Sequence, residues 1–186
     1  MEALISFIRE NCLPKNLRSN INTELVCSVT VGAVDKRGDG YGISASTTLH
    51  KGMLTKLLHG VAQDVAIRGD GPRHYSSICL NVDVKCRLHV DGRNEGSSFV
   101  VAGGEYTGGE LFLASDENSS ATSTYAVEET DIHTAEEILY VGSLVKGNKH
   151  DIHMSWKEFT GNTPHAVCPF EGFRISCVFL VYLPRE

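Results

Sequence analysis

The sequence predicts a mainly β protein with N-terminal helices, in which the strands form a double-stranded β-helix barrel of the jelly-roll, cupin-like type. Short apolar runs separated by glycine-containing turns recur along the last two thirds of the chain. Apolar residues at helical spacing are confined to the first third. The 186 residues fit one domain, with residues 1–72 as a helical and strand support and residues 73–186 as the barrel core.

The composition is typical of a globular domain, with 41% hydrophobic and 22% charged residues. No apolar run approaches the roughly 20 residues that span a bilayer. Six cysteines are scattered without a C-x-x-C pair, so neither a disulfide framework nor a zinc knuckle is expected. We therefore expect an intracellular protein, nuclear or cytoplasmic, with reduced thiols and no membrane association.

The charge balance does not favour extensive nucleic-acid binding. The formal net charge is −6 and the pI is about 5.7. The basic runs are pairs such as Lys36-Arg37, whereas nucleic-acid affinity comes largely from neutralised phosphates. An enzyme that contacts a short stretch of nucleic acid through one local patch remains compatible with this composition.

Two helices are predicted near the N-terminus. Residues 1–11 lack the charged, apolar and small-residue order of a secretory signal and fit a short amphipathic helix. Apolar residues at helical spacing predict a second helix over residues 49–67, capped by Thr47 and Thr48. A Gly-Asp-Gly-Pro run at residues 69–72 ends it.

The most informative predicted strand covers residues 78–91, where apolar residues alternate strictly with polar ones. This period of two places one apolar and one polar face on the strand. A face this rich in polar side chains indicates a lined cavity or contact with water. The other predicted strands cover residues 24–34, 41–45, 98–102, 110–114, 138–145, 154–159 and 173–183.

The polar face of this strand carries a candidate metal site. His89 and Asp91 lie two positions apart and therefore on the same face, and His165 is a third candidate from a distant segment. Two His and one carboxylate leave coordination positions open for cosubstrate and oxygen, which is the arrangement of non-haem Fe(II) oxygenases. The alternative for the H-x-D run alone is a salt-linked His at a strand end.

The last predicted strand carries a candidate anion anchor. Arg174 and Ser176 open it and share one face with Val178, Leu180 and Tyr182. An Arg with a neighbouring hydroxyl can clamp a carboxylate such as that of 2-oxoglutarate. The alternative is a solvated charge on an edge strand, and the apolar residues on both sides of Arg174 argue against it.

Four ordered motifs carry a resemblance to a known family. They are H-V-D (89–91), G-G-E-L (108–111), W-K-E-F-T-G-N-T-P-H (156–165) and P-F-E-G-F-R-I-S (169–176). This set resembles the Fe(II)- and 2-oxoglutarate-dependent oxygenases, most of all their TET/JBP-like branch of 5-methylpyrimidine oxygenases. The resemblance covers residues 75–183. It implies a dioxygenase that binds Fe(II) through His89, Asp91 and His165 and uses 2-oxoglutarate and O2.

The resemblance also implies a substrate, a methylated pyrimidine in DNA or RNA. The motif of the branch reads H-x-D-x-x-N, and its Asn, which contacts the target base, corresponds to Asn94. The branch places a Tyr and a His four and six residues beyond the serine, where this chain has Leu180 and Tyr182. Tyr182 can still stack on a base.

Three questions stay open at this point. Asn81, on the polar face of the 78–91 strand, either hydrogen-bonds the keto-acid end of the cosubstrate or serves a structural role. The substrate is alternatively a protein side chain such as proline, because prolyl hydroxylases share the H-x-D motif, a distal His and a basic anchor. The third alternative is an inactive binding module that kept the fold.

Overall fold

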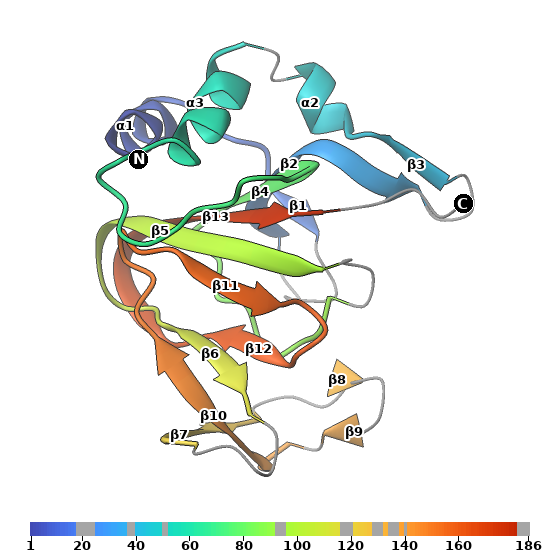
Figure 1. Cartoon of the computed structure of the whole chain (residues 1–186), viewed down its shortest axis with the longest axis vertical. Coiled ribbons are helices and arrows are strands. Elements are labelled where there is room, and N and C mark those ends of the chain that lie inside the picture. The colour runs from blue at the N-terminus through green and yellow to red at the C-terminus, as the bar shows by residue number, and fades with distance from the viewer. Residues whose placement is uncertain are drawn as a thin grey trace.

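A computed structural model describes residues 1–17, 25–36, 40–49, 52–91, 96–115, 121–127, 132–133, 138–139 and 141–181 (Figure 1). The elements in chain order are α1 (Glu2–Glu10), β1 (Asn16–Leu17), β2 (Leu25–Lys36), β3 (Gly40–Ile43), α2 (Ala45–Leu49), α3 (Met53–Val61), β4 (Ser77–Val82), β5 (Ser97–Gly108), β6 (Leu111–Ala114), β7 (Ser123–Ala126), β8 (Ile132–His133), β9 (Ile138–Leu139), β10 (Leu144–His150), β11 (Lys157–Thr160), β12 (His165–Val167) and β13 (Phe170–Leu180).

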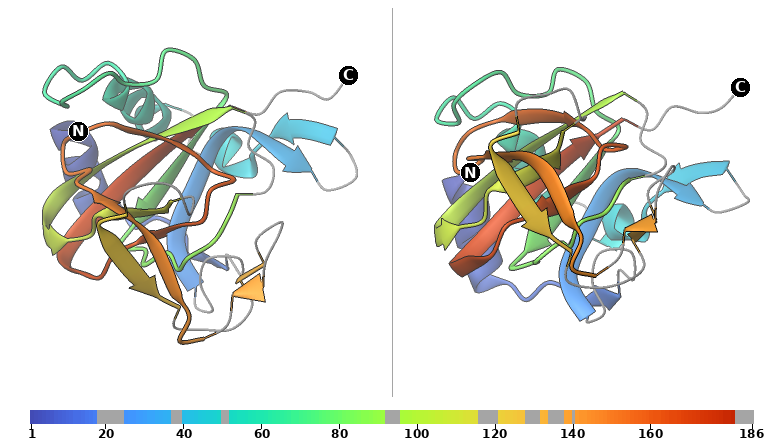
Figure 2. Two further views of the ribbon diagram at one scale, coloured as in Figure 1. Left: turned by 60° about the horizontal axis from the view of Figure 1, so that its bottom comes forward. Right: turned by 90° about the horizontal axis from the view of Figure 1, so that it is seen from below.

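The strands form two main antiparallel sheets. A seven-stranded sheet has the order β1-β2-β4-β13-β5-β11, with β3 paired to β2, and a four-stranded sheet has the order β12-β6-β10-β7. Strands β8 and β9 pair with each other. Figure 2 shows the yellow and orange strands of the smaller sheet lying in front of the larger sheet. The mainly β prediction with N-terminal helices is confirmed, but the strands of the described residues do not close into a barrel.

Helices α1 and α3 cover one face of the larger sheet (Figure 1). Their apolar faces meet alternate residues of the central strands, for example Leu4 and Leu58 from the helices and Leu80 and Ile175 from the sheet. All four side chains are at most 1% exposed. The amphipathic helix predicted for the N-terminus is therefore present as α1. Among the described residues, no helix is long and apolar enough to cross a membrane.

The helix predicted over residues 49–67 is present but shorter, since α3 covers Met53–Val61. Helix α2 ends at Leu49, and α3 begins after Gly52, whose φ of 111° suits glycine and interrupts helical geometry. Thr47 does not cap the helix. Ser44 precedes α2, and its Oγ accepts a hydrogen bond from the Thr47 backbone N–H at 3.1 Å, which is the geometry of an N-cap.

The long strand predicted over residues 78–91 is also too long, since β4 ends at Val82. Asp83 has a φ of 53°, a left-handed conformation that Asp tolerates better than most residues. Its backbone N–H donates to the carbonyl of Arg174 at 2.8 Å, which fixes the turn against β13. The chain then leaves the larger sheet, and His89 bridges to His165 beside the smaller one.

Other strand boundaries shift without changing the architecture. The strand predicted over residues 138–145 is divided into β9 and β10, with a turn at Gly142, whose φ is 84°. Strand β5 continues six residues past the predicted end at Ala102, to Gly108. Strand β13 begins three residues earlier than predicted, at Phe170. The end of that prediction, residues 182–183, lies outside the described residues.

Candidate metal and cosubstrate site

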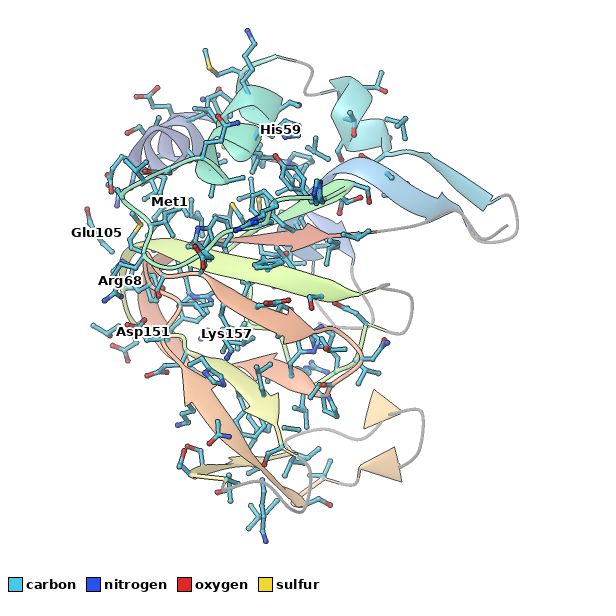
Figure 3. All side chains as sticks on the ribbon, viewed as in Figure 1. Met1, His59, Arg68, Glu105, Asp151 and Lys157 are labelled. Carbon is cyan, nitrogen blue, oxygen red and sulfur yellow. The ribbon has the colours of Figure 1, made fainter. Side chains whose placement is uncertain are left out.

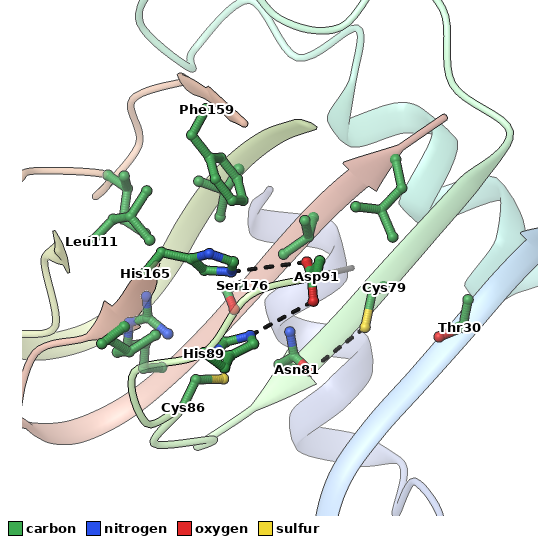
Figure 4. Close-up of a pocket in the computed structure, with 17 residues that line it drawn as sticks. Thr30, Cys79, Asn81, Cys86, His89, Asp91, Leu111, Phe159, His165 and Ser176 are labelled. Carbon is green, nitrogen blue, oxygen red and sulfur yellow. Dashed lines mark hydrogen bonds and ion pairs between the residues drawn. The ribbon is translucent and has the colours of Figure 1, made fainter. Parts of the chain in front are cut away.

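The structure brings His89, Asp91 and His165 together (Figure 4). One ligand atom from each lies within 4.8 Å of the others. The Asp91 carboxylate oxygens are 3.7 Å from His89 Nε2 and 3.8 Å from His165 Nε2. Two nitrogens and one carboxylate oxygen thus face a common point, as ligands of a single ion do.

Backbone pairing holds the two histidines in register. The N–H of each donates to the carbonyl of the other at 2.9 Å. Asp91 is held in the same way, because its N–H donates to the carbonyl of Gly161 at 2.8 Å. All three side chains therefore start from backbone positions that hydrogen bonds have already fixed.

The histidine rings are oriented for metal binding. His89 Nδ1 donates to the carbonyl of Arg87 at 2.7 Å, and His165 Nδ1 donates to the carbonyl of Thr163 at 2.8 Å. A carbonyl can only accept, so each Nδ1 carries the proton and each Nε2 presents a lone pair. Such carbonyl partners are typical of histidines that bind metals through the other nitrogen.

The three side chains line a cavity of about 100 Å³ on the face of the larger sheet away from the helices. Two rows of cross-strand neighbours form part of its wall. One row contains the cavity residues Asn81 and Ser176, and Ser28 lies beside Asn81 in the same row. The next row contains Thr30, Cys79 and Val178. Arg174 lies two residues before Ser176 on the same face of β13, and it lines the same cavity.

Arg174 is buried without a counter-ion. Its side chain belongs to a residue only 1% exposed, and Nη2 donates to the carbonyl of Gly109 at 3.2 Å. Nε has no hydrogen-bond partner, and Arg174 forms no ion pair with a carboxylate of the described residues. Burial lowers the pKa of this guanidinium. A charge held in this way is costly unless an anion reaches it.

The surroundings of Arg174 fix its direction. The guanidinium carbon lies 5.4 Å from the ring centre of Tyr106 and 5.3 Å from that of Phe170. Gly109 leaves the space for it, since a Cβ there would lie 2.9 Å from Arg174 Nε. The Asp83 carboxylate accepts the Arg174 backbone N–H at 2.8 Å rather than pairing with the side chain.

Asn81 presents its amide nitrogen to the metal side of the cavity (Figure 4). Its Oδ1 accepts hydrogen bonds from the Ser28 hydroxyl at 2.8 Å and from the Cys79 thiol at 3.7 Å. Two donors on the oxygen side fix which end of the amide faces the cavity. Ser176 is 4% exposed and also lines the cavity.

The structure thus collects six of the eight predicted site residues in one cavity. The other two, Asn94 and Tyr182, lie outside the described residues. Sequence reasoning missed Ser28, Thr30 and Phe159. The alternating V-C-S-V-T-V run places Ser28 and Thr30 on one face of β2 but does not reveal that β4 lies beside it. Phe159 is a buried core residue that also lines the cavity.

Comparison with known proteins does not identify the family. No protein-family model matches the chain, and no curated protein matches it either. The geometry of the cavity therefore carries the functional argument.

Proposed function

We propose that this protein is an Fe(II)- and 2-oxoglutarate-dependent dioxygenase that oxidises a C–H bond. The observation that carries the proposal is the buried Arg174, which has no carboxylate partner among the described residues. It lies in the same cavity as the His89, Asp91 and His165 group. A dicarboxylate satisfies both, because its keto-acid end can chelate a metal while its other carboxylate pairs with the guanidinium.

The donor set fits iron. Two imidazole nitrogens and one carboxylate oxygen, without sulfur, form the set that non-haem Fe(II) oxygenases use, and they leave positions open for further ligands. When bound, iron and 2-oxoglutarate supply the activation of O2 that inserts one oxygen atom into a C–H bond, with succinate and CO2 as coproducts.

The chain's own residues bind and orient these partners. Arg174 holds the remote carboxylate, and Ser176 adds a hydroxyl beside it. The Asn81 amide nitrogen donates to an oxygen at the keto-acid end, in an orientation that Ser28 and Cys79 fix. Phe159 and Ile152, at most 7% exposed, help to exclude water from the cavity.

The strand connections support a double-stranded β-helix. From β4 the chain crosses to the His89 bridge and back to β5, then runs through β6, β7 and β10 of the smaller sheet, and crosses again at β11, β12 and β13. The larger sheet then reads β4-β13-β5-β11, and the smaller one reads His89 bridge-β12-β6-β10. This interleaving is our basis for proposing a jelly-roll.

The methyl group of a methylated pyrimidine in DNA or RNA is the first candidate for the oxidised position. It follows from the resemblance to the TET/JBP-like branch and from Asn94 and Tyr182. A protein side chain is the second candidate, favoured by a groove along the edge of the larger sheet. An inactive binding module is the outcome if no chemistry is found.

Succinate production tests the proposal. The protein, incubated with Fe(II), 2-oxoglutarate, O2 and either 5-methylcytosine DNA, 5-methylcytosine RNA or proline-rich peptides, is expected to form succinate and a product heavier by one oxygen. Mass spectrometry identifies the substrate class. Iron-dependent succinate formation in no arm, even at millimolar 2-oxoglutarate, would contradict an oxygenase.

Ser28→Ala is expected to weaken 2-oxoglutarate binding about 2- to 10-fold, because a lost hydrogen bond of this kind contributes about 0.5–1.5 kcal/mol. The cause is loss of the donor that orients Asn81. Calorimetry of the Mn(II)-loaded protein measures it without turnover. Ser77→Ala is the matched control, since it removes a buried hydroxyl on β4 that bonds the Ala33 carbonyl and is not among the cavity residues. Equal losses in both variants would mean that the orientation of Asn81 is not responsible.

A further inference from the structure

The outer edge of β11 is partly paired by the chain itself. Arg68 forms a parallel bridge with Ser155: its N–H donates to the Met154 carbonyl, and its carbonyl accepts from the Trp156 N–H, both at 2.9 Å. The Arg68 side chain extends this contact to the carbonyl of His153 at 3.1 Å. Figure 3 shows Arg68 and Lys157 along this side of the larger sheet. This edge of the larger sheet therefore already accepts one backbone bridge, just before β11 begins.

The Arg68 bridge ends before β11 begins, so it leaves the outer side of β11 uncovered. Backbone groups in a strand alternate between its two neighbours, so Glu158 and Thr160 face outward like Trp156, whereas Lys157 and Phe159 pair with β5. Strand β11 is the last in the larger sheet, and no described strand covers its outer side. The Glu158 N–H and carbonyl and the Thr160 N–H therefore remain open to another chain.

A groove of about 850 Å³ runs along this open edge. All five consecutive residues 156–160 line it. Ser97 and Phe99 of β5 and Val181 after β13 also line it, so the groove extends from the edge across the neighbouring strands. Its opposite wall contains Asp70, Arg73 and His74, which are exposed.

The groove leads to the metal cavity. Phe159 lines both, and its ring centre is 5.0 Å from that of His165. The Asp91 N–H bonds the carbonyl of Gly161, the residue directly after β11. Phe159 is thus a shared wall of the groove and the cavity, so a chain lying in the groove contacts a residue that packs on a proposed ligand.

We propose that this groove binds an extended polypeptide segment, which adds to β11 as a further strand. The open backbone groups complement a peptide backbone, and β11 spans about 13 Å, which corresponds to about four residues of partner. The formal charges of Arg73 and Lys157 cancel those of Asp70 and Glu158. A polyphosphate backbone would need an excess of cations here, so a peptide fits better than nucleic acid.

The groove stands on geometry alone, whereas the role of the bound segment as a substrate rests on the proposed dioxygenase.

The probe is an array of several hundred acetylated hexapeptides with randomly chosen, known sequences. The array is incubated with the fluorescently labelled full chain without metal. A subset of spots is expected to bind. A labelled single-stranded oligonucleotide with 5-methylcytosine is expected not to compete with the bound peptides for the groove at physiological salt.

Two perturbations locate the binding. Glu158→Pro removes the outward N–H and spares the ladder to β5, so it is expected to reduce peptide binding tenfold or more, whereas Glu158→Ala retains binding. N-methylation of each bound peptide, position by position, leaves the protein unchanged. Strand addition predicts that every second N-methyl group abolishes binding.

Some outcomes overturn the proposal: no peptide binds, binding ignores both Glu158→Pro and N-methylation, or the oligonucleotide competes for the groove. Because no iron is present, absence of dioxygenase activity does not affect this result. Alternating N-methyl sensitivity with no succinate formation would keep the peptide groove and remove the proposed chemistry.

Discussion

Replacing His89, Asp91 or His165 by Ala is expected to lower both metal affinity and turnover by on the order of 100-fold or more. Changes to residues that merely support metal ligands typically lose 10- to 100-fold, so loss of a ligand should exceed that. The fold should persist, because the three side chains line a cavity and their backbones carry the pairing. Calorimetry with Mn(II) and succinate formation measure the two effects, and circular dichroism checks the fold.

His59→Ala is the matched control for these variants. It removes an exposed imidazole on α3 that stacks on Tyr75 and is not among the cavity residues. This variant should bind metal as the natural sequence does. If a variant of one of the three residues kept near-normal succinate formation at ordinary iron concentrations, that residue would not be a ligand.

Arg174→Ala is expected to weaken 2-oxoglutarate by one to three decades, since loss of one partner of a buried charged pair costs about 2–4 kcal/mol. Arg174→Lys should recover part of this loss, because the charge remains while the planar fork does not. The dependence of the rate on 2-oxoglutarate concentration measures both. An unchanged cosubstrate constant in Arg174→Ala would place the anchor elsewhere.

A third substitution at the same position separates binding from stability. Arg174→Met keeps most of the side-chain volume and removes a buried charge that has no carboxylate partner among the residues the structure describes. Without ligands, the thermal stability of this variant should equal or exceed that of the natural sequence, while 2-oxoglutarate binding is lost. A large loss of stability would instead mean that Arg174 serves the core.

The sequence predicted the parts of the site that depend on strand periodicity. Arg174 and Ser176 face the cavity because alternate residues of a strand share a face, and Cys79 and Asn81 follow the same rule on β4. The order of the motifs also indicated that His165 joins His89 and Asp91. Local spacing cannot supply that contact, because the two segments meet only through the smaller sheet.

Features that depend on tertiary context were not predictable. The break at Asp83 is stabilised by its bond to Arg174, a residue far along the chain. The contribution of β2 to the cavity depends on its pairing with β4, which no local pattern reveals. The groove depends on Arg68 pairing beside β11 and then turning away. Each of these is set by which strands become neighbours.

The reciprocal backbone bonds between His89 and His165 bear on how the proposed iron ion would exchange with solution. The backbone bonds already bring the two distant segments together, so the entropic cost of joining them belongs to folding. Binding of an ion therefore needs little further ordering of the chain. This differs from small zinc modules, whose chains collapse only around the metal. If the proposed metal site holds an ion, a protein built this way would lose and reload that ion while folded, and its metal content would follow supply in its surroundings.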